Sequence, residues 1–280
     1  MANPFDILRR PILPIAPDPI FAQRLRARLE RLMKGTTMDT DLAADATIAA
    51  RHGDVDYVSL WVPDATKAAD FFSAVLGWSF EPGSDRRQVE GLSIRHGFWG
   101  GQEHNTLFLC FAVSDVNAAA ARVEAAGGTA SPPDEQPYGL LSDCVDDQGM
   151  RFALHQSLGV VGRSAGPANG ARHGDISYLT LEVQDSGRFR RFFGDVLGWR
   201  FQPGRVEDGW GVEDVVPMTG LQGGHDRATC VPMYRVDDII AAVARVRAAG
   251  GTATDPSSES YGLMSECQDD QGTRFYLGQH

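Results

Sequence analysis

Two similar stretches of the chain decide its fold. Residues 52–80 read HGDVDYVSLWVPDATKAADFFSAVLGWSF and residues 173–201 read HGDISYLTLEVQDSGRFRRFFGDVLGWRF, which gives 14 identities in 29 positions. A second pair of stretches, 126–154 and 249–277, shares 18 of 29 positions and includes the motif C-x-D-D-Q-G-x-R-F. A repeat of this length is much longer than the unit of a solenoid, so it indicates a duplicated domain.

The duplicated stretches divide the chain into four parts. We predict a first copy over residues 51–157, a linker over 158–172 that is rich in Gly, Ala and Ser, and a second copy over 173–280. The remaining part, residues 1–50, is an extension in which DPIFAQRLRARLERLMKG has apolar residues at helical spacing and an Arg-rich outer face. This amphipathic helix is expected to dock on the acidic body of the protein, or alternatively on a partner or an anionic surface.

Each copy has the pattern of an α+β domain. VDYVSLWV alternates β-branched or aromatic residues with polar ones, which is typical of a strand, and ATKAADFFSAVLG is a helix that ends at Gly77. Strands are predicted over 86–98 and 106–113. A second helix begins after Asp115, and a last strand reads MRFALHQ. The second copy repeats this order.

Composition excludes several classes of protein. The 280 residues carry a formal net charge of −11 and an isoelectric point near 5.0, whereas a domain that binds nucleic acid usually has a basic balance. The four cysteines include no C-x-x-C pair, and no run of about 18 apolar residues is present. We therefore expect a cytoplasmic protein with no membrane segment and no nucleic-acid partner. A homodimer is compatible with the sequence.

The order of these motifs resembles the vicinal oxygen chelate superfamily, which includes glyoxalase I, extradiol dioxygenases and bleomycin-resistance proteins. The resemblance rests on a strand ending in V-x-D, a helix containing FF, the tripeptide LGW, a later helix ending in AAGG, and D-x-x-G before the final strand. It covers both copies but not residues 1–50. It implies two tandem βαβββ modules that form an eight-stranded, half-open barrel with one cleft per module.

The resemblance also implies positions for a divalent metal, and this sequence departs from the family there. Enzymes of the superfamily bind the metal through a His or Gln on the first strand, a residue on a middle strand and a Glu on the last strand. These positions fall on Tyr57, Phe108 and Ala153 in the first copy, and on Tyr178, Val231 and Tyr276 in the second. Because a neutral tyrosine is a poor ligand for such cations, we predict that the metal site is absent and that no cofactor is bound.

Alternation along the strands selects the residues that face each cleft, because side chains two apart share a face of a strand. The predicted ligand-binding residues are Tyr57, Trp61, Phe108 and Arg151 in the first copy, and Tyr178, Glu182, Met233, Arg235, Arg274 and Tyr276 in the second. Trp99 and Trp210 lie in the Gly-rich stretches FWGG and DGWGVED, and we expect both to line a cleft as well.

The sequence is compatible with three functions. The first is metal-independent binding of a small organic ligand, aromatic or a natural product, as in resistance proteins. The alternative is a glyoxalase-like lyase or isomerase that acts on a carbonyl compound, with an atypical metal site or with Glu182 as a catalytic base. Glu182 has two other possible roles: it could contact a ligand, or it could form a structural ion pair with Arg235 or Arg274. The third function is an interaction protein that docks through its N-terminal helix.

Overall fold

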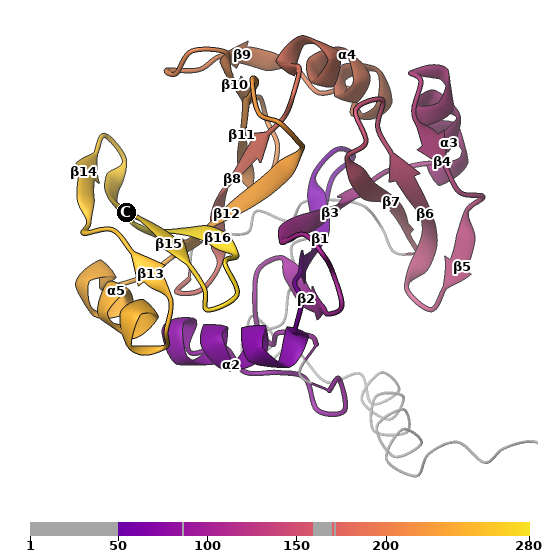
Figure 1. Ribbon diagram of the computed structural model, residues 1–280. Coiled ribbons are helices and arrows are strands. Elements are labelled where there is room, and N and C mark those ends of the chain that lie inside the picture. The colour runs from indigo at the N-terminus through magenta and orange to yellow at the C-terminus, as the bar shows by residue number, and fades with distance from the viewer. Residues whose placement is uncertain (1–49, 86, 159–169, 171) are drawn as a thin grey trace, which may run out of the picture. The chain divides into compact units, whose positions relative to one another are not determined.

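The computed structural model describes residues 50–85, 87–158, 170 and 172–280, all of which belong to one compact unit of the chain (Figure 1). The predicted N-terminal helix and most of the predicted linker lie outside the described residues. Among the residues described, no helix is both long enough and apolar enough to cross a membrane.

The two copies follow the same order of elements, apart from two short strands that only the second copy has. In the first copy these are β1 (Val55–Trp61), α2 (Ala65–Leu76), β2 (Arg95–Trp99), β3 (Thr106–Ala112), α3 (Val116–Ala125), β4 (Thr129–Ala130), β5 (Asp134–Gln136), β6 (Gly139–Val145) and β7 (Arg151–Ser157). In the second copy they are β8 (Ile176–Glu182), α4 (Ser186–Leu197), β9 (Phe201–Pro203), β10 (Gly209–Val212), β11 (Met218–Gln222), β12 (Thr229–Arg235), α5 (Ile239–Ala248), β13 (Thr252–Ala253), β14 (Ser257–Glu259), β15 (Gly262–Gln268) and β16 (Arg274–Gln279). The second copy adds the short strands β9 and β10.

Each copy builds its own mixed sheet. Within the described residues, the first sheet has seven strands in the order β2-β1-β3-β7-β6-β4, with β5 paired to β6. The second has nine strands in the order β13-β15-β16-β12-β8-β11-β10-β9, with β14 paired to β15. This corrects the expected single eight-stranded barrel. Each copy supplies two helices and a complete sheet, because the duplicated unit is longer than one βαβββ module.

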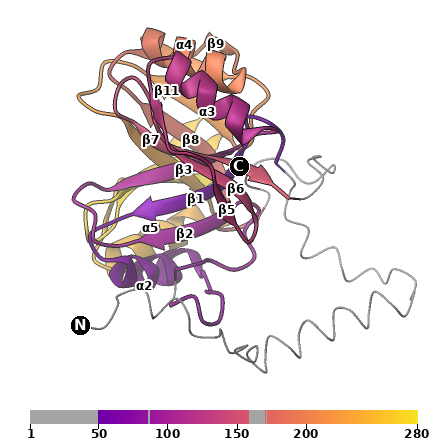
Figure 2. The same cartoon turned by 90° about the vertical axis from the view of Figure 1, so that its right-hand side faces the viewer.

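Helices of one copy lie beside helices of the other. Both views place α2 next to α5, and α3 next to α4 (Figures 1 and 2). Phe72 of α2 contacts Phe275 of β16 with ring centroids 5.3 Å apart, and Phe152 of β7 contacts Phe193 of α4 at the same separation. All four rings are almost fully buried, so one apolar core joins the two copies.

The motif D-D-Q-G holds the two copies together reciprocally. Gln271 accepts a hydrogen bond from the backbone N–H of Asp64 (2.8 Å) and donates one to its carbonyl (3.0 Å). Gln148 makes the same two contacts with Asp185 (2.8 and 3.1 Å). Asp64 and Asp185 are the N-caps of α2 and α4. Each copy therefore fixes the start of the other copy's first helix.

The motif H-G-D makes a second reciprocal contact. Asp175 accepts hydrogen bonds from the backbone N–H (2.9 Å) and the hydroxyl (2.7 Å) of Ser93 in the first copy. Asp54 accepts one from the backbone N–H of Val216 (3.0 Å) in the second. Both aspartates are almost fully buried. The repeated residues in the sequence are thus largely those that join the copies.

Candidate functional site

Each sheet has one side that packs against helices and an opposite side, here called the inner face. Leu60, Leu109 and Phe152 lie on the helix side and belong to the core. On the inner face of the first copy, Tyr57 of β1 pairs with Cys110 of β3, which pairs with Ala153 of β7. These registers confirm that the alternation assigned in the sequence is correct.

In the second copy the corresponding row is Tyr178 of β8, Met233 of β12 and Tyr276 of β16. Cys110 and Met233 thus occupy the middle strand of these two rows. Phe108 and Val231 instead pair with Ser59 and Thr180 on the same face. Residues two apart on a strand share a face, so Phe108 and Val231 lie on the inner face together with Cys110 and Met233.

These rows do not supply the ligands of a hard divalent cation. Burial raises the pKa of the Cys110 thiol far above its ordinary value, so the thiol stays protonated. Met233 offers a soft thioether, and burial raises the pKa of Tyr178 and of Tyr276. Across the described ranges, no group of three or more His, Cys, Asp or Glu side chains is placed to hold a metal ion. The donor set therefore does not fit the metal that the superfamily implies.

Both first-strand tyrosines lean across the neighbouring strand over a glycine. A Cβ atom built on Gly97 would clash with the Tyr57 hydroxyl, and a Cβ on Gly220 would clash with the Tyr178 hydroxyl. Gln88 donates a hydrogen bond to the Tyr57 oxygen at 3.1 Å. The two glycines are thus required by the position of the tyrosine rings.

Replacing Gly220 with Ala is expected to lower the free energy of unfolding by about 1–3 kcal/mol, because the new methyl group would displace the Tyr178 ring. Gly211 on β10 provides the matched control, since a Cβ there would meet only the Gln202 side chain, at ordinary contact distances from 3.6 Å. Urea denaturation measures both variants. Equal effects of Gly220→Ala and Gly211→Ala would show that the tyrosine does not occupy this position.

The inner face of the first copy carries an aromatic cluster. Trp61 stacks on Phe108 with centroids 4.7 Å apart and meets Trp99 edge-on at 5.6 Å. The Arg151 guanidinium carbon lies 4.7 Å from the centroid of the Trp61 ring. Four of the predicted residues therefore come together, and Trp99 remains 57% exposed at the edge.

At the equivalent place in the second copy, an ion pair replaces the aromatic cluster. Arg274 donates two hydrogen bonds to Glu182, at 2.7 and 2.9 Å, and these hydrogen bonds raise the pKa of Arg274. Because both Glu182 oxygens are held, the geometry favours the ion-pair interpretation of Glu182 over a catalytic base. His225 lies 3.8 Å from the same carboxylate.

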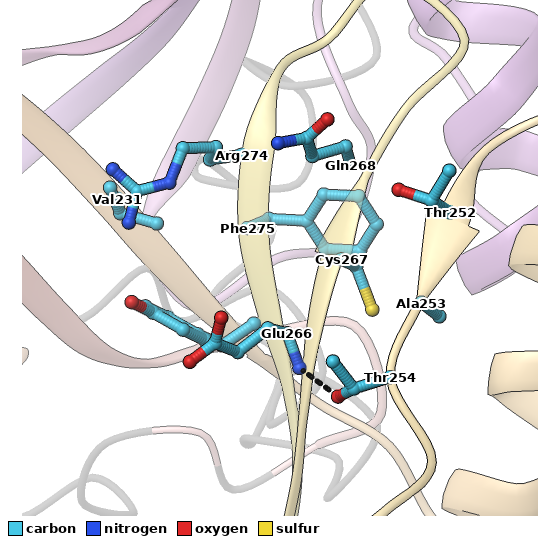
Figure 3. A pocket seen from close by; sticks show the side chains of 10 residues that line it. Val231, Thr252, Ala253, Thr254, Glu266, Cys267, Gln268, Arg274 and Phe275 are labelled. Carbon is cyan, nitrogen blue, oxygen red and sulfur yellow. Dashed lines mark hydrogen bonds between the residues drawn. The ribbon is translucent and has the colours of Figure 1, made fainter.

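Two pockets flank this ion pair. The larger, of about 310 Å³, lies over β13, β15 and β16 and is lined by Val231, Thr252, Ala253, Thr254, Glu266, Cys267, Gln268, Arg274, Phe275 and Tyr276 (Figure 3). Figure 3 shows Val231 and Arg274 on one side of it and Thr252 to Thr254 on the other. The smaller, of about 210 Å³, lies at the other side of Arg274 and includes Glu182 and His225. Arg274 lines both pockets.

Two predicted residues lie apart from this site. Trp210 of β10 pairs with Leu221, which pairs with the core residue Leu181, so Trp210 lies on the helix side. Its ring packs 3.6 Å from the Arg190 guanidinium carbon of α4. This corrects the prediction that Trp210 lines a cleft: the Gly-rich stretches around Trp99 and Trp210 are not equivalent, and Trp99 corresponds to Gln222. Arg235 forms an ion pair with Asp237 (3.2 Å) at the far end of β12.

A charged group that strand alternation does not predict lies on the inner face of the first copy. Asp56, Arg95 and His155 are in contact there. Simple alternation places Asp56 on the opposite face from Tyr57, but β1 is irregular between Val55 and Tyr57, which turns Asp56 inward. The signal available in the sequence was a difference between the copies, since Ser177, Met218 and Gly278 occupy the corresponding positions.

Comparison with known proteins agrees with this architecture. Residues 57–155 match the family described as a glyoxalase-like domain. The anthracycline biosynthesis protein DauV of Streptomyces sp. (strain C5) is 24% identical over 255 residues, which cover 78% of this chain and 90% of that protein. DnrV of Streptomyces peucetius, also described as an anthracycline biosynthesis protein, matches with the same identity and coverage.

Solved structures share the fold of both copies. The Mn(II)-bound glyoxalase from Novosphingobium aromaticivorans superposes with a TM-score of 0.63 at 18% identity, over 82% of this chain and 83% of that one. The 2,3-dioxygenase LapB from Pseudomonas sp. KL28 superposes with a TM-score of 0.60 at 16% identity, over 82% of this chain and 94% of that one. Residues 57–155 are therefore similar to the glyoxalase-like domain family, and the described part of the chain shares the fold of these glyoxalase and dioxygenase structures.

Proposed function

We propose that the protein binds a small, planar aromatic molecule on the inner face of its second copy, without the help of a metal. The observation that carries this proposal is the pocket of about 310 Å³, which brings the predicted residues Arg274 and Tyr276 together on that face. Its volume is at the lower end of the range of small-molecule sites. The tyrosine ring supplies an aromatic wall, while Arg274, Gln268 and Glu266 supply polar contacts.

The protonation states at this pocket suit binding by hydrogen bonds. Burial raises the pKa of Tyr276, so its hydroxyl remains a donor at neutral pH. Glu182 holds the Arg274 guanidinium through two hydrogen bonds, which keeps this donor in a fixed place. A preorganised donor loses little entropy when a ligand arrives, so it favours affinity.

The relatives support a planar aromatic ligand. DauV and DnrV are described as anthracycline biosynthesis proteins, and an anthracycline is built on a planar anthraquinone ring system. The metal-independent part of the proposal rests on the donor set, in which tyrosines, a thioether and a protonated thiol stand where ligands are expected. Stoichiometric Mn, Ni, Zn or Fe in the purified protein, measured by elemental analysis, would contradict it.

The Tyr276→Ala variant is expected to bind anthraquinone-2-sulfonate about tenfold more weakly than the unaltered protein. The substitution removes the aromatic wall, and stacking contributes about 0.5–1.5 kcal/mol beyond area burial. Ala153 occupies the equivalent position in the first copy, so the fold accommodates an alanine at this position. Isothermal titration calorimetry measures the affinity.

Trp99→Ala provides the control for this experiment, since it deletes an exposed aromatic side chain from the other copy. Its affinity should equal that of the unaltered protein. A Tyr276→Ala variant with full affinity, or an equal loss in Trp99→Ala, would exclude the pocket in the second copy as the binding site.

A further inference from the structure

The charged group of the first copy has a definite geometry. One carboxylate oxygen of Asp56, Oδ2, is in contact with Nδ1 of His155 and lies 3.3 Å from Nη2 of Arg95. Nε2 of His155 lies 3.3 Å from the carbonyl oxygen of Tyr138. His155 is 3% exposed, whereas the Arg95 side chain is 43% exposed. The buried imidazole of His155 therefore contacts the Asp56 carboxylate, and the accessible guanidinium of Arg95 lies beside the same carboxylate.

Each ring nitrogen of His155 faces a hydrogen-bond acceptor. A backbone carbonyl can only accept a hydrogen bond, so Nε2 must carry a proton to donate to Tyr138. Burial alone would raise the pKa of Asp56, but hydrogen bonds and charges from His155 and Arg95 outweigh it and lower that pKa. Asp56 is thus ionised and also acts as an acceptor. The ring of His155 is therefore held between the Asp56 carboxylate and the Tyr138 carbonyl.

The fold does not require this group. In the second copy, Ser177, Met218 and Gly278 occupy the three positions, and the strands around them keep the same pairing. Burying charges costs desolvation free energy, and apolar or small residues at such places are often equally stable. The second copy therefore serves as an internal control: a charged group that the same architecture does without points to a role in the first copy beyond folding.

We propose that Asp56 and Arg95 form a second ligand site, which binds an aryl compound carrying a hydrogen-bond donor beside a carbonyl oxygen, such as an aromatic carboxamide. Within the described residues, the contacts of Asp56 with His155 and Arg95 both fall on Oδ2, which leaves Oδ1 to accept from the ligand. The remaining N–H groups of Arg95 can donate to the carbonyl.

Aromatic side chains beside the charged group give the site its aryl preference. Tyr57 of β1 is the strand partner of Arg95 of β2 on the inner face. Tyr138 is 49% exposed, and its ring meets that of His155 edge-on at 5.6 Å. His155 acts as a positioning residue, because its imidazole ring holds the Asp56 carboxylate without reaching the ligand.

The test compares benzamide with acetophenone, which differ only in an amide nitrogen and a methyl group. Ligand-observed NMR titration of the full chain should show benzamide binding about five- to tenfold more tightly, as expected for donor recognition by an ionised acceptor. Asp56→Ser, which installs the residue of the second copy, should abolish this preference. Arg95→Met, which also installs the residue of the second copy, should weaken the binding of both probes, because Arg95 donates to the carbonyl that both probes carry. Asp143→Ser, which changes an exposed carboxylate at a strand position paired with Ala153, should retain the preference for benzamide.

Two further variants keep the result unambiguous. In Tyr276→Ala the preference for benzamide should persist, which separates this site from the pocket of the second copy. In His155→Gly the preference should fall, and free imidazole in the buffer should restore it, which a purely structural loss would not allow. Equal affinity for both probes in the unaltered protein, a preference that survives Asp56→Ser, or unchanged affinity for both probes in Arg95→Met overturns the inference.

Discussion

Acidification is expected to destabilise the unaltered protein more steeply than a His96→Gln variant. His96 is fully buried, and burial lowers its pKa from 6.5 to about 3. Its ring packs against Trp78 and Phe98, and its Nε2 lies 3.0 Å from the Tyr234 hydroxyl of the second copy. In the neutral form Nδ1 donates to the Gly97 carbonyl, so Nε2 accepts from Tyr234.

The sign of this effect follows from the proton balance. Between pH 6.5 and about pH 3 the unfolded chain binds a proton at His96 that the folded chain does not, so the free energy of unfolding falls as the pH falls. The slope is about 1.4 kcal/mol per pH unit, or about 3 kcal/mol between pH 6.5 and pH 4. Gln can replace both hydrogen bonds but does not titrate.

Urea denaturation at a series of pH values measures this difference. The His96→Gln variant should lose the part of the slope that comes from His96, even if it is less stable at neutral pH. His104→Gln, at an exposed position, is the control and should keep the slope of the unaltered protein. Parallel pH profiles for all three proteins would show that His96 is not buried in its neutral form.

Replacing Asp175 with Ala is expected to lower the free energy of unfolding by about 3–5 kcal/mol. The buried carboxylate accepts from the backbone N–H and hydroxyl of Ser93, and from the backbone N–H and Nε of Arg172 (3.1 and 3.4 Å). Without it, the part-buried backbone N–H of Ser93 has lost its acceptor, and the first copy has lost a contact with the second.

Thermal and urea unfolding measure the effect. Asp237→Ala is the matched control, because that carboxylate belongs to the same copy but is 65% exposed, and it should change the stability by less than about 1 kcal/mol. If Asp175→Ala and Asp237→Ala proved equally stable, the contact between Asp175 and Ser93 would not be present in solution.

The sequence predicts the elements well because their signals are local. The cap at Asp115 and the end of α2 at Gly77 follow from short-range chemistry, and the structure confirms them. Alternation also assigns the inner face correctly for Tyr57 and Tyr178. Predicting the face of these two residues requires only the two-residue period of a strand, which does not depend on the rest of the chain.

The number of sheets and the composition of the site could not be predicted in the same way. Strand pairing between distant segments decides that there are two sheets, and no local pattern encodes it. The irregularity in β1 turns Asp56 inward, and β9 and β10 place Trp210 on the helix side. The ion pair of Glu182 with Arg274 was one of two pairings left open, because only the register of β8, β12 and β16 selects between Arg274 and Arg235.

The reciprocal contacts of Gln148 and Gln271 have a consequence for the origin of the chain. Each glutamine recognises only the backbone at the start of a helix, so it cannot distinguish a helix in its own polypeptide from one in another. A single ancestral copy would satisfy both contacts by associating with an identical molecule around a two-fold axis. Fusing the genes would then have freed the halves to diverge, which is how one half could come to carry charges where the other has Ser, Met and Gly.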